Sequence, residues 1–283
     1  MTVQSNLVFF DRQMRVPSWD QSKLDIHCLV LGVGGYGTHV AMQLCRIGVR
    51  RLTLVDFDRV ESSNLNRQML FGPSSIGKPK VEVALQTLLE THALITQVDG
   101  NEFDIARDQK ELTRMVKKAD VTFACIDPPL AFLTALICYE YRKPMFTGGT
   151  TPQYGHTFEI FVQGTEGRPC YECMMGFART APEMEAAHIT KLEDKLEYAR
   201  RINEMQAQRR PPRTGASVIY TAATASSFMV MQMVKFLNQW QYNRRIIMNL
   251  LTLEILKFDP EARKGCFICG RRDERSSSAS AIS

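Results

Sequence analysis

The chain has 283 residues, of which 45% are hydrophobic and 23% charged, so it can bury a sizeable core. The net charge of +5 arises from Lys and Arg spread along the chain, which suits an anionic ligand, but there is no arginine-rich block to predict nucleic-acid binding. No apolar stretch reaches membrane-spanning length and the first residues contain no signal-peptide core, so we expect a cytoplasmic protein without a membrane partner, whose 8 cysteines are thiols or metal ligands.

The first 58 residues contain the most informative stretch of the chain. Residues 1–27 form a polar N-terminal segment, in which Arg12 taken alone is a solvated surface charge. The pattern that follows predicts a strand, a glycine turn, a helix that stops at Gly48, and a second strand that ends at Asp56. The two strands and the helix are expected over residues 28–31, 52–55 and 38–47.

The glycine turn predicts a nucleotide site. Gly32, Gly34 and Gly37 match the pattern G-x-G-x-x-G, and Gly35 adds a further glycine. In such a turn the first glycine allows the tight turn, the second allows close approach of a phosphate, and the third allows tight packing of helix on strand. The helix start attracts anions, and Asp56 can accept hydrogen bonds from ribose hydroxyls. The alternative is an ordinary tight turn without a ligand.

Polar side chains follow the strands at the edge where a parallel sheet binds its ligands. Asn64, Arg67 and Lys80 fall on loops or at a helix start, just beyond the strand ends. Arg67 offers a planar fork and Lys80 a point charge, so the two cations can bridge a triphosphate. Asp127 ends a later strand, where its carboxylate can hold Mg²⁺ or cap the following helix. These two roles of Asp127 are compatible.

Strands and helices alternate up to about residue 162. This alternation predicts an α/β fold with a Rossmann-like, doubly wound and mainly parallel sheet. Further helices are expected from about residue 80 and over residues 112–118 and 130–141. Further strands are expected over residues 95–98, 121–126, 144–147 and 158–162.

Two Cys-x-x-Cys pairs, Cys170 with Cys173 and Cys266 with Cys269, lie far apart in the sequence. Four thiolates form the tetrahedral ligand set that Zn²⁺ prefers, and they leave no open position for catalysis. We therefore expect a structural zinc site that pins a C-terminal extension back onto the middle of the chain. A redox-active Cys-x-x-Cys pair is the alternative.

The C-terminal part is expected to add two helical regions, a strand and a tail. Residues 183–210 look like a charged amphipathic helix, which is a packing helix or, alternatively, a lid or partner-docking element. Residues 216–237 are apolar and rich in small residues, which predicts a buried helix or helix pair at a dimer interface, with its methionines in the core. A strand is expected over 248–256, and the serine-rich residues 271–283 are expected to form a disordered tail.

Six motifs in order resemble those of the ThiF/MoeB/HesA family, which has the adenylating fold of ubiquitin-activating enzymes. They are the glycine turn 32–37, the stretch Asp56-Phe57-Asp58, the loop 64–68, residues 77–80, residues 125–127 and the paired Cys-x-x-Cys. The resemblance runs from about Phe10 to Gly270. It implies a single adenylylation domain over 1–270, in which residues 170–270 carry the zinc knuckles, the charged helix and the buried helix.

The resemblance also implies roles for individual residues. The glycines would line ATP, Asp56 would hold its ribose, and Asp127 would associate with Mg²⁺. Arg12 matches an arginine that reaches the partner subunit's ATP in family homodimers. The nucleotide-binding positions are matched by Gly32, Gly34, Gly35, Gly37, Asp56, Asn64, Arg67, Lys80 and Asp127. The catalytic positions are matched by Arg12, Arg67, Lys80 and Asp127.

The implied reaction is adenylylation of a carboxylate by ATP, with release of pyrophosphate. The acceptor implied by the family is the C-terminus of a ubiquitin-like or sulfur-carrier protein with a Gly-Gly tail. Members that form a thioester have a cysteine before the long apolar helix, but residues 210–216 contain none. We therefore expect no protein thioester, with the other cysteines as core thiols. These are Cys28, Cys45, Cys125 and Cys138.

Two alternatives remain within the family. Pro128 and the knuckle Cys170-Tyr171-Glu172-Cys173 are similar to microcin-C-type enzymes, which adenylate a ribosomal peptide. The chain could also be an inactive partner subunit of a homologous activating enzyme, although the presence of Arg67 and Lys80 argues against this. A nicotinamide dehydrogenase explains neither Lys80 nor the four paired cysteines.

Overall fold

The computed structural model describes residues 7–150, 156–165, 169–175, 191–197, 200, 217–263, 266 and 268–269. The predicted tail over 271–283 and most of the predicted charged helix over 183–210 lie outside these residues. Within the latter stretch residues 191–197 and 200 are described, and Leu192 and Leu196 pack with the hydrophobic cluster that contains residues 131–139 and 171–174.

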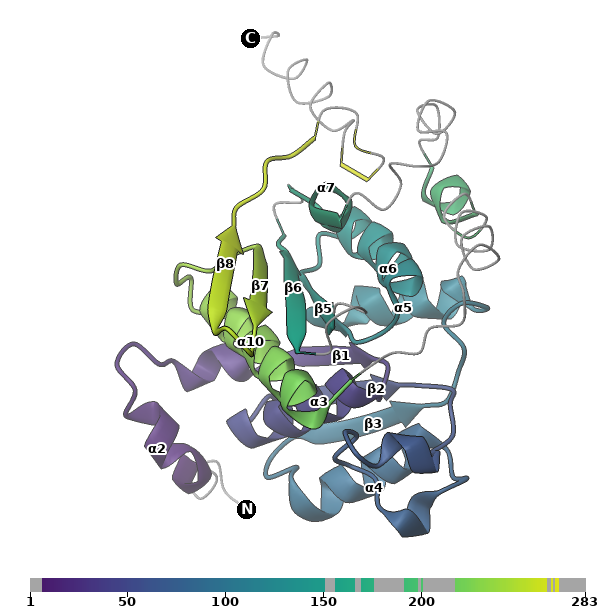
Figure 1. Cartoon of the computed structure of the whole chain (residues 1–283), viewed down its shortest axis with the longest axis vertical. Coiled ribbons are helices and arrows are strands. Elements are labelled where there is room, and N and C mark those ends of the chain that lie inside the picture. Colours follow the sequence, from purple (N-terminus) through teal and green to yellow (C-terminus); the bar gives the residue numbers. More distant parts are fainter. Residues whose placement is uncertain are drawn as a thin grey trace, which may run out of the picture.

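An eight-stranded sheet forms the centre of the structure, in the order β3-β2-β1-β4-β5-β6-β7-β8 (Figure 1). The pairs among β3, β2, β1, β4 and β5 are parallel, which confirms the predicted doubly wound α/β fold, whereas β6, β7 and β8 are added antiparallel. Because the chain moves outward from β1 to β3 and then returns to β4, the strand order reverses between β1 and β4. The strands are β1 (His27–Leu31), β2 (Arg51–Val55), β3 (Gln97–Asn101), β4 (Val121–Ala124), β5 (Met145–Thr150), β6 (Thr157–Gln163), β7 (Arg245–Asn249) and β8 (Glu254–Phe258).

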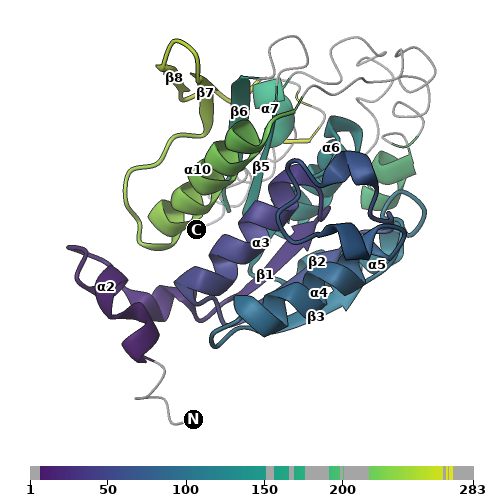
Figure 2. The ribbon, with the colours of Figure 1, turned by 60° about the horizontal axis from the view of Figure 1, so that its bottom comes forward.

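Helices cover both faces of the parallel strands, and Figure 2 shows α3 and α10 side by side on one of them. Along β1 the side chains alternate, so Cys28 and Val30 join the core beneath α3, α4 and α10. Leu29 and Leu31 join a second core beneath α5 and α6. The helices are α2 (Asp11–Met14), α3 (Gly35–Ile47), α4 (Lys80–Thr91), α5 (Gln109–Lys118), α6 (Pro128–Glu140), α7 (Tyr171–Met175) and α10 (Ile219–Leu237).

Two expected strands are placed differently by the structure. The strand expected over 95–98 is β3, which begins at Gln97, because the Thr96 hydroxyl donates a hydrogen bond to the Val49 carbonyl (2.7 Å) just before the ladder starts. The single strand expected over 248–256 is wrong, because this apolar stretch belongs to the β7–β8 hairpin. The Asn249 side chain accepts the Leu251 amide (2.9 Å), and this local turn breaks the stretch where no Gly or Pro signals a break.

The expected helical region over 216–237 is one helix, α10, and its Met229 and Met233 lie in the core as predicted. Its small residues allow close approach to α3, where the Ser226 hydroxyl donates to the Tyr36 carbonyl (3.0 Å). Ile219, Tyr220 and Met231 of α10 are exposed, and the expected dimer interface stays a prediction.

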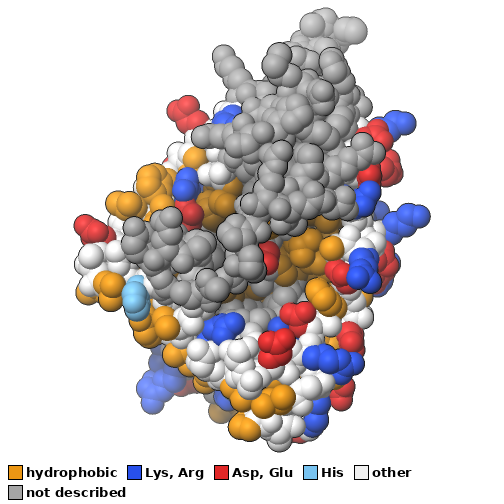
Figure 3. All heavy atoms as spheres, turned by 45° about the vertical axis from the view of Figure 1, so that its right-hand side comes forward, with side chains coloured by type: hydrophobic (Ala, Val, Ile, Leu, Met, Phe, Trp, Pro, Cys, Tyr) orange, Lys and Arg blue, Asp and Glu red, His pale blue; other side chains and the backbone are white. Residues whose placement is uncertain are grey.

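Among the described residues, no helix combines the length and apolar character that crossing a bilayer would require. Figure 3 shows Lys and Arg side chains interspersed with Asp and Glu over the described part of one face. This mixture agrees with a net positive charge that is spread along the chain rather than gathered in one block.

Candidate active site

The glycine turn between β1 and α3 contains glycines of two kinds. Gly32 has φ +85°, and a Cβ there would collide with the Cys125 carbonyl of the neighbouring strand end. A Cβ on Gly37 would lie 2.8 Å from the Gly32 carbonyl carbon and closer still to its oxygen. The fold itself therefore requires both glycines.

Gly34 and Gly35 are different, because the protein leaves room for a side chain at both. The nearest atom to a Cβ on Gly34 would be the side-chain nitrogen Nε2 of Gln68 at 3.8 Å. The nearest atom to a Cβ on Gly35 would belong to the Arg67 side chain, at 3.7 Å. Both distances are ordinary van der Waals contacts. Since packing does not explain these two glycines, they are free to serve a ligand that approaches the backbone at the start of α3.

Asp56 follows β2 and is tied directly to the glycine turn. Its carboxylate accepts the Val33 amide (2.6 Å) and the Asp58 amide (2.8 Å). Burial raises the pKa of Asp56, and the two backbone hydrogen bonds and nearby Lys80 oppose that rise only in part. A half-buried carboxylate at this position can accept further hydrogen bonds from a ligand's hydroxyl groups.

Lys80 begins α4 and is held beside the same turn. Its side chain is only 8% exposed, and Nζ lies 2.9 Å from the Asp58 carboxylate, whose side chain is 51% exposed. The Lys80 amide also donates to the Asp58 carbonyl (2.9 Å). The ammonium is thus kept near the strand ends by a partner that faces solvent, so an anionic ligand could approach the same pair.

The loop over 62–68 brings polar side chains toward the turn, but not all for the same purpose. Asn64 is buried, and its side-chain oxygen accepts the Glu61 amide (3.1 Å), so it stabilises the loop. Arg67 runs along Gly35 and donates to the Ser63 carbonyl (2.8 Å) and the Asn66 side chain (2.9 Å). Arg67 therefore lies next to the start of α3, whereas Asn64 supports the loop that carries it.

Asp127 lies at the N-cap position of α6, directly after β4. The Cys125 amide donates to the Leu31 carbonyl (2.8 Å), so the end of β4 is adjacent to the end of β1. Asp127 is exposed at this same edge of the sheet. Its backbone carbonyl accepts the Leu130 and Ala131 amides (3.0 Å each), and its side chain makes no capping hydrogen bond to α6. Carboxylate oxygens at this edge fit the hard cation Mg²⁺.

Arg12 is not brought to the glycine turn of its own chain. It is exposed on α2, and the neighbouring Phe10 packs against Gly48, which follows the last residue of α3. The 13 residues of α3 separate that end from the turn by about 20 Å. Its role in a partner subunit's site stays a prediction.

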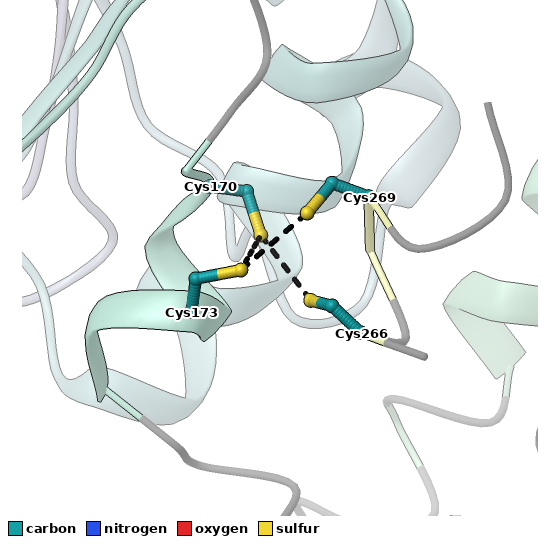
Figure 4. Close-up of side chains that lie close together, drawn as sticks. All are labelled: Cys170, Cys173, Cys266 and Cys269. Atoms are coloured by element: carbon teal, nitrogen blue, oxygen red, sulfur yellow. Dashed lines mark hydrogen bonds between the residues drawn. The ribbon is translucent and has the colours of Figure 1, made fainter. Parts of the chain in front are cut away.

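The four paired cysteines form a buried cluster, whose side chains point toward one another in Figure 4. Their sulfur atoms all lie within 4.8 Å of one another, with Cys170 3.5 Å from Cys266 and Cys173 3.4 Å from Cys269. Tetrahedral zinc with Zn–S bonds of about 2.3 Å requires sulfur separations of about 3.8 Å. The donor set therefore fits structural Zn²⁺, which would join α7 to the C-terminal residues.

The remaining four cysteines are poor nucleophiles. Burial raises the pKa of Cys45, Cys125 and Cys138 to about 12, and that of Cys28 further still. Because the thiolate is the reactive form, these groups stay protonated and unreactive at neutral pH. This agrees with their predicted role as core thiols.

A model of the ThiF family matches residues 10–268, which is most of the chain. The chain belongs to the ThiF family. This membership confirms the resemblance drawn from the order of the motifs.

Two curated relatives show how far the ThiF likeness extends in sequence. The chain is 31% identical over 173 residues to molybdopterin-synthase adenylyltransferase of Escherichia coli (strain K12). That alignment covers 58% of this chain and 66% of the relative. The chain is 31% identical over 164 residues to the NEDD8-activating enzyme E1 catalytic subunit of Arabidopsis thaliana, which covers 52% of this chain and 34% of that protein. The chain therefore spans less than two thirds of the length of either relative.

Solved structures share the ThiF fold over a larger part of the chain. E. coli MccB with ATP has a TM-score of 0.67 at 23% identity and covers 88% of this chain and 68% of that chain. PaaA has a TM-score of 0.68 at 18% identity and covers 92% of this chain and 84% of that chain. These likenesses establish a common fold.

Two ion pairs of this ThiF-family chain were not expected from the sequence. One is the pair between Lys80 and Asp58, for which the second acid of Asp56-Phe57-Asp58 was an available signal. The other joins the fully buried Glu172, inside the first Cys-x-x-Cys, to Arg263 (2.8 Å) before the second. A carboxylate between the two cysteines of a Cys-x-x-Cys pair was the signal there. This pair ties the two knuckles together independently of a metal.

Proposed function

We propose that this chain uses ATP to adenylylate the C-terminal carboxylate of a ubiquitin-like or sulfur-carrier protein, releasing pyrophosphate. The observation that carries the proposal is the open glycine turn at Gly34 and Gly35. Its neighbours Asp56, Arg67 and Lys80 offer ribose and phosphate partners at the same edge of the sheet. The curated relatives named as adenylyltransferase and as activating-enzyme subunit support the same reaction.

In this proposal the start of α3 receives the phosphates, and Asp56 accepts the ribose hydroxyls. A carboxylate is already ionised at neutral pH, so attack on the α-phosphate needs no general base. The protein must instead offset the repulsion between two anions and hold them in line. Arg67 and Lys80 supply that electrostatic stabilisation, each contributing on the order of 3 kcal/mol.

Three further parts of the proposal concern ligands and partners. Asp127 would hold Mg²⁺, which neutralises phosphate charge when bound. Arg12 would act on the nucleotide of a partner subunit in a homodimer, since it lies at the far end of α3 in its own chain. Zn²⁺ bound by the four clustered cysteines would have a structural role, because four sulfur ligands leave no open position.

A ribosomal peptide is a second candidate for the acceptor. E. coli MccB, solved with ATP and with MccA, shares the fold over 88% of this chain. Pro128 after Asp127 supports the same candidate. An inactive partner subunit is disfavoured, because Arg67, Lys80 and Asp127 are all present.

ATP–pyrophosphate exchange in the presence of candidate acceptors tests the proposal. Arg67→Ala should lower exchange by roughly a hundredfold, because about 3 kcal/mol of electrostatic stabilisation is lost. Arg114→Ala, on the surface of α5 and paired with Glu111, is the matched control and should exchange normally. Normal exchange by Arg67→Ala would remove that residue from the site, and mass spectrometry of the adenylated acceptor separates protein from peptide.

A further inference from the structure

Glu172 is a fully buried carboxylate that lies inside the first Cys-x-x-Cys pair, between Cys170 and Cys173. Its side chain is 0% exposed, and Arg263 Nη2 lies 2.8 Å from its Oε1. The same nitrogen lies 3.5 Å from the Glu172 backbone carbonyl. Four cysteines are sufficient to hold a tetrahedral ion, and burying a charged pair costs desolvation energy that apolar side chains would not. Neither metal ligation nor packing therefore explains a charged pair at this position.

Arg263 also contacts both Cys-x-x-Cys pairs through its backbone. Its amide donates to the Cys173 sulfur (3.4 Å), and its carbonyl accepts the Cys266 amide (3.3 Å). Its guanidinium is 25% exposed and reaches the Glu172 carboxylate between the first two cysteines. One residue therefore links the two halves of the four-cysteine cluster, with separate groups for each half.

The two halves of the cluster are anchored to the fold in different ways. The first half is fixed by Gln163, whose side-chain oxygen accepts the Tyr171 amide (2.8 Å) and whose side-chain nitrogen donates to the Ala135 carbonyl of α6 (3.0 Å). The second half packs into the core through Ile268, which is 2% exposed. Apolar contact has no preferred direction, whereas the fork of an arginine does. Arg263 therefore supplies a directional contact that Ile268 cannot.

We propose that Glu172 and Arg263 are positioning residues of the zinc site. The Glu172 carboxylate fixes the Arg263 side chain, and this places the Arg263 amide against the Cys173 sulfur and its carbonyl against the Cys266 amide. An N–H donated to a coordinating sulfur fixes its orientation, and the guanidinium offsets part of the negative charge that four thiolates bring to a buried site. This inference rests on the zinc site of the proposed function and does not involve the nucleotide.

Zinc affinity tests the proposal, measured on the full chain under reducing conditions by competition with a chromophoric chelator. Arg263→Met and Glu172→Gln should each bind Zn²⁺ about ten- to a hundredfold more weakly than the unmodified chain, because residues that hold metal ligands in place have effects of this size. The double variant should lose little more affinity than the weaker-binding single variant, since both substitutions remove the same contact.

Arg245→Met is the matched control. Arg245 forms a comparably buried ion pair with Glu159 and donates to the Met174 carbonyl of α7 (3.1 Å), but within the described part of the chain its hydrogen bonds do not reach a cysteine. Arg245→Met should therefore bind Zn²⁺ within twofold of the unmodified chain, even where its melting temperature is lower.

Co²⁺ in place of Zn²⁺ gives a second readout that a general loss of stability would not change. Loss of the N–H donor to the Cys173 sulfur makes that sulfur more electron-rich. The sulfur-to-cobalt charge-transfer band should therefore move to lower energy in Arg263→Met and in Glu172→Gln. The band of Arg245→Met should stay where it is in the unmodified chain.

The outcomes separate this inference from the proposed function. If the unmodified chain binds no Zn²⁺, the zinc site fails together with this inference, whereas ATP–pyrophosphate exchange still tests adenylylation. If it binds Zn²⁺ and both single variants bind it within twofold, this inference alone is overturned. Additive losses in the double variant, or an equal loss in Arg245→Met, would also overturn it, because two separate contacts or general destabilisation would then be the cause. Glu172→Gln, which keeps the size and shape of the side chain, decides the question if Arg263→Met does not fold.

Discussion

Substitution of the second and last glycines of the turn separates a ligand requirement from a folding requirement. Gly34 has φ −88° and ψ −149°, outside the left-handed region that favours glycine, and the nearest atom to its new Cβ would lie at 3.8 Å. Gly34→Ala should therefore change the free energy of unfolding by less than about 1 kcal/mol in either direction, because the restriction of the unfolded chain offsets the modest cost of this ψ. Gly37→Ala should instead lower it by about 3 kcal/mol, since the methyl group meets the Gly32 backbone.

Gly34→Ala should weaken nucleotide binding although it leaves the fold nearly unchanged in stability. A methyl group on Gly34 would occupy the space through which, in the proposed function, a phosphate would reach the amides at the start of α3. Loss of one such charge-stabilising contact costs about 3 kcal/mol, so ATP–pyrophosphate exchange by Gly34→Ala should fall by about a hundredfold. Denaturant unfolding without nucleotide measures the free energy of unfolding of each variant. ATP–pyrophosphate exchange at saturating acceptor measures its activity.

Either of two results would contradict a ligand-binding role for the Gly34 backbone. Exchange by Gly34→Ala within twofold of the unmodified chain would mean that no phosphate approaches this backbone. A loss of stability equal to that of Gly37→Ala would mean that the fold needs the glycine, whatever the ligand. The paired substitution makes the two results distinguishable, because both variants add the same methyl group within one turn of chain.

Three other predictions concern different parts of the molecule. Metal analysis should find about one Zn²⁺ per chain, and Cys266→Ser should lower the melting temperature by several degrees, because metal binding energy is folding energy; a metal-free chain of equal stability would disprove this. Burial raises the pKa of Asp56, and only the ionised carboxylate can accept every available hydrogen bond, so the affinity for ATP should fall on acidification at a higher pH than an ordinary aspartate would give. Asp56→Asn should lack this pH dependence when ATP is titrated from pH 7 to pH 4. Mixing Arg12→Ala with Lys80→Met chains should restore exchange only if Arg12 acts across a dimer, because one site of the mixed dimer then has both cations; no recovery in an equilibrated mixture would exclude the trans role.

Much of the fold follows from local patterns in the sequence. The glycine turn, the capping Gly48 and the apolar runs of β1 and β2 are each encoded within a few residues, and the structure places them as expected. The β7–β8 hairpin is not encoded in this way, because its turn is made by the Asn249 side chain rather than by Gly or Pro. The start of β3 likewise depends on a hydrogen bond from Thr96 to the distant Val49, which no local pattern records.

The candidate site, like the fold, is only partly encoded in local sequence patterns. Residue types and their order predict which side chains gather at the strand ends, and the four cysteines meet although they lie far apart in the sequence. A motif does not show whether a buried polar atom has a hydrogen-bond partner, because this depends on every residue packed around the atom. Gln68 and Gln163 are the same residue type and both are buried, yet only the structure shows that the side-chain oxygen of Gln68 lacks a partner among the described residues, whereas both ends of the Gln163 amide have one.

The free protein therefore holds several groups in arrangements that do not maximise its own stability. Among the described residues, Gln68 and His39 each have a buried side-chain atom without a hydrogen-bond partner, and Asp56 is a carboxylate whose burial opposes its charge. These arrangements destabilise the free chain, and they lie around one turn whose Gly34 leaves space for a ligand. A ligand with phosphates, hydroxyl groups and a bound cation would offset part of this cost, and its binding should raise the melting temperature of the chain by an amount set by its affinity and its concentration.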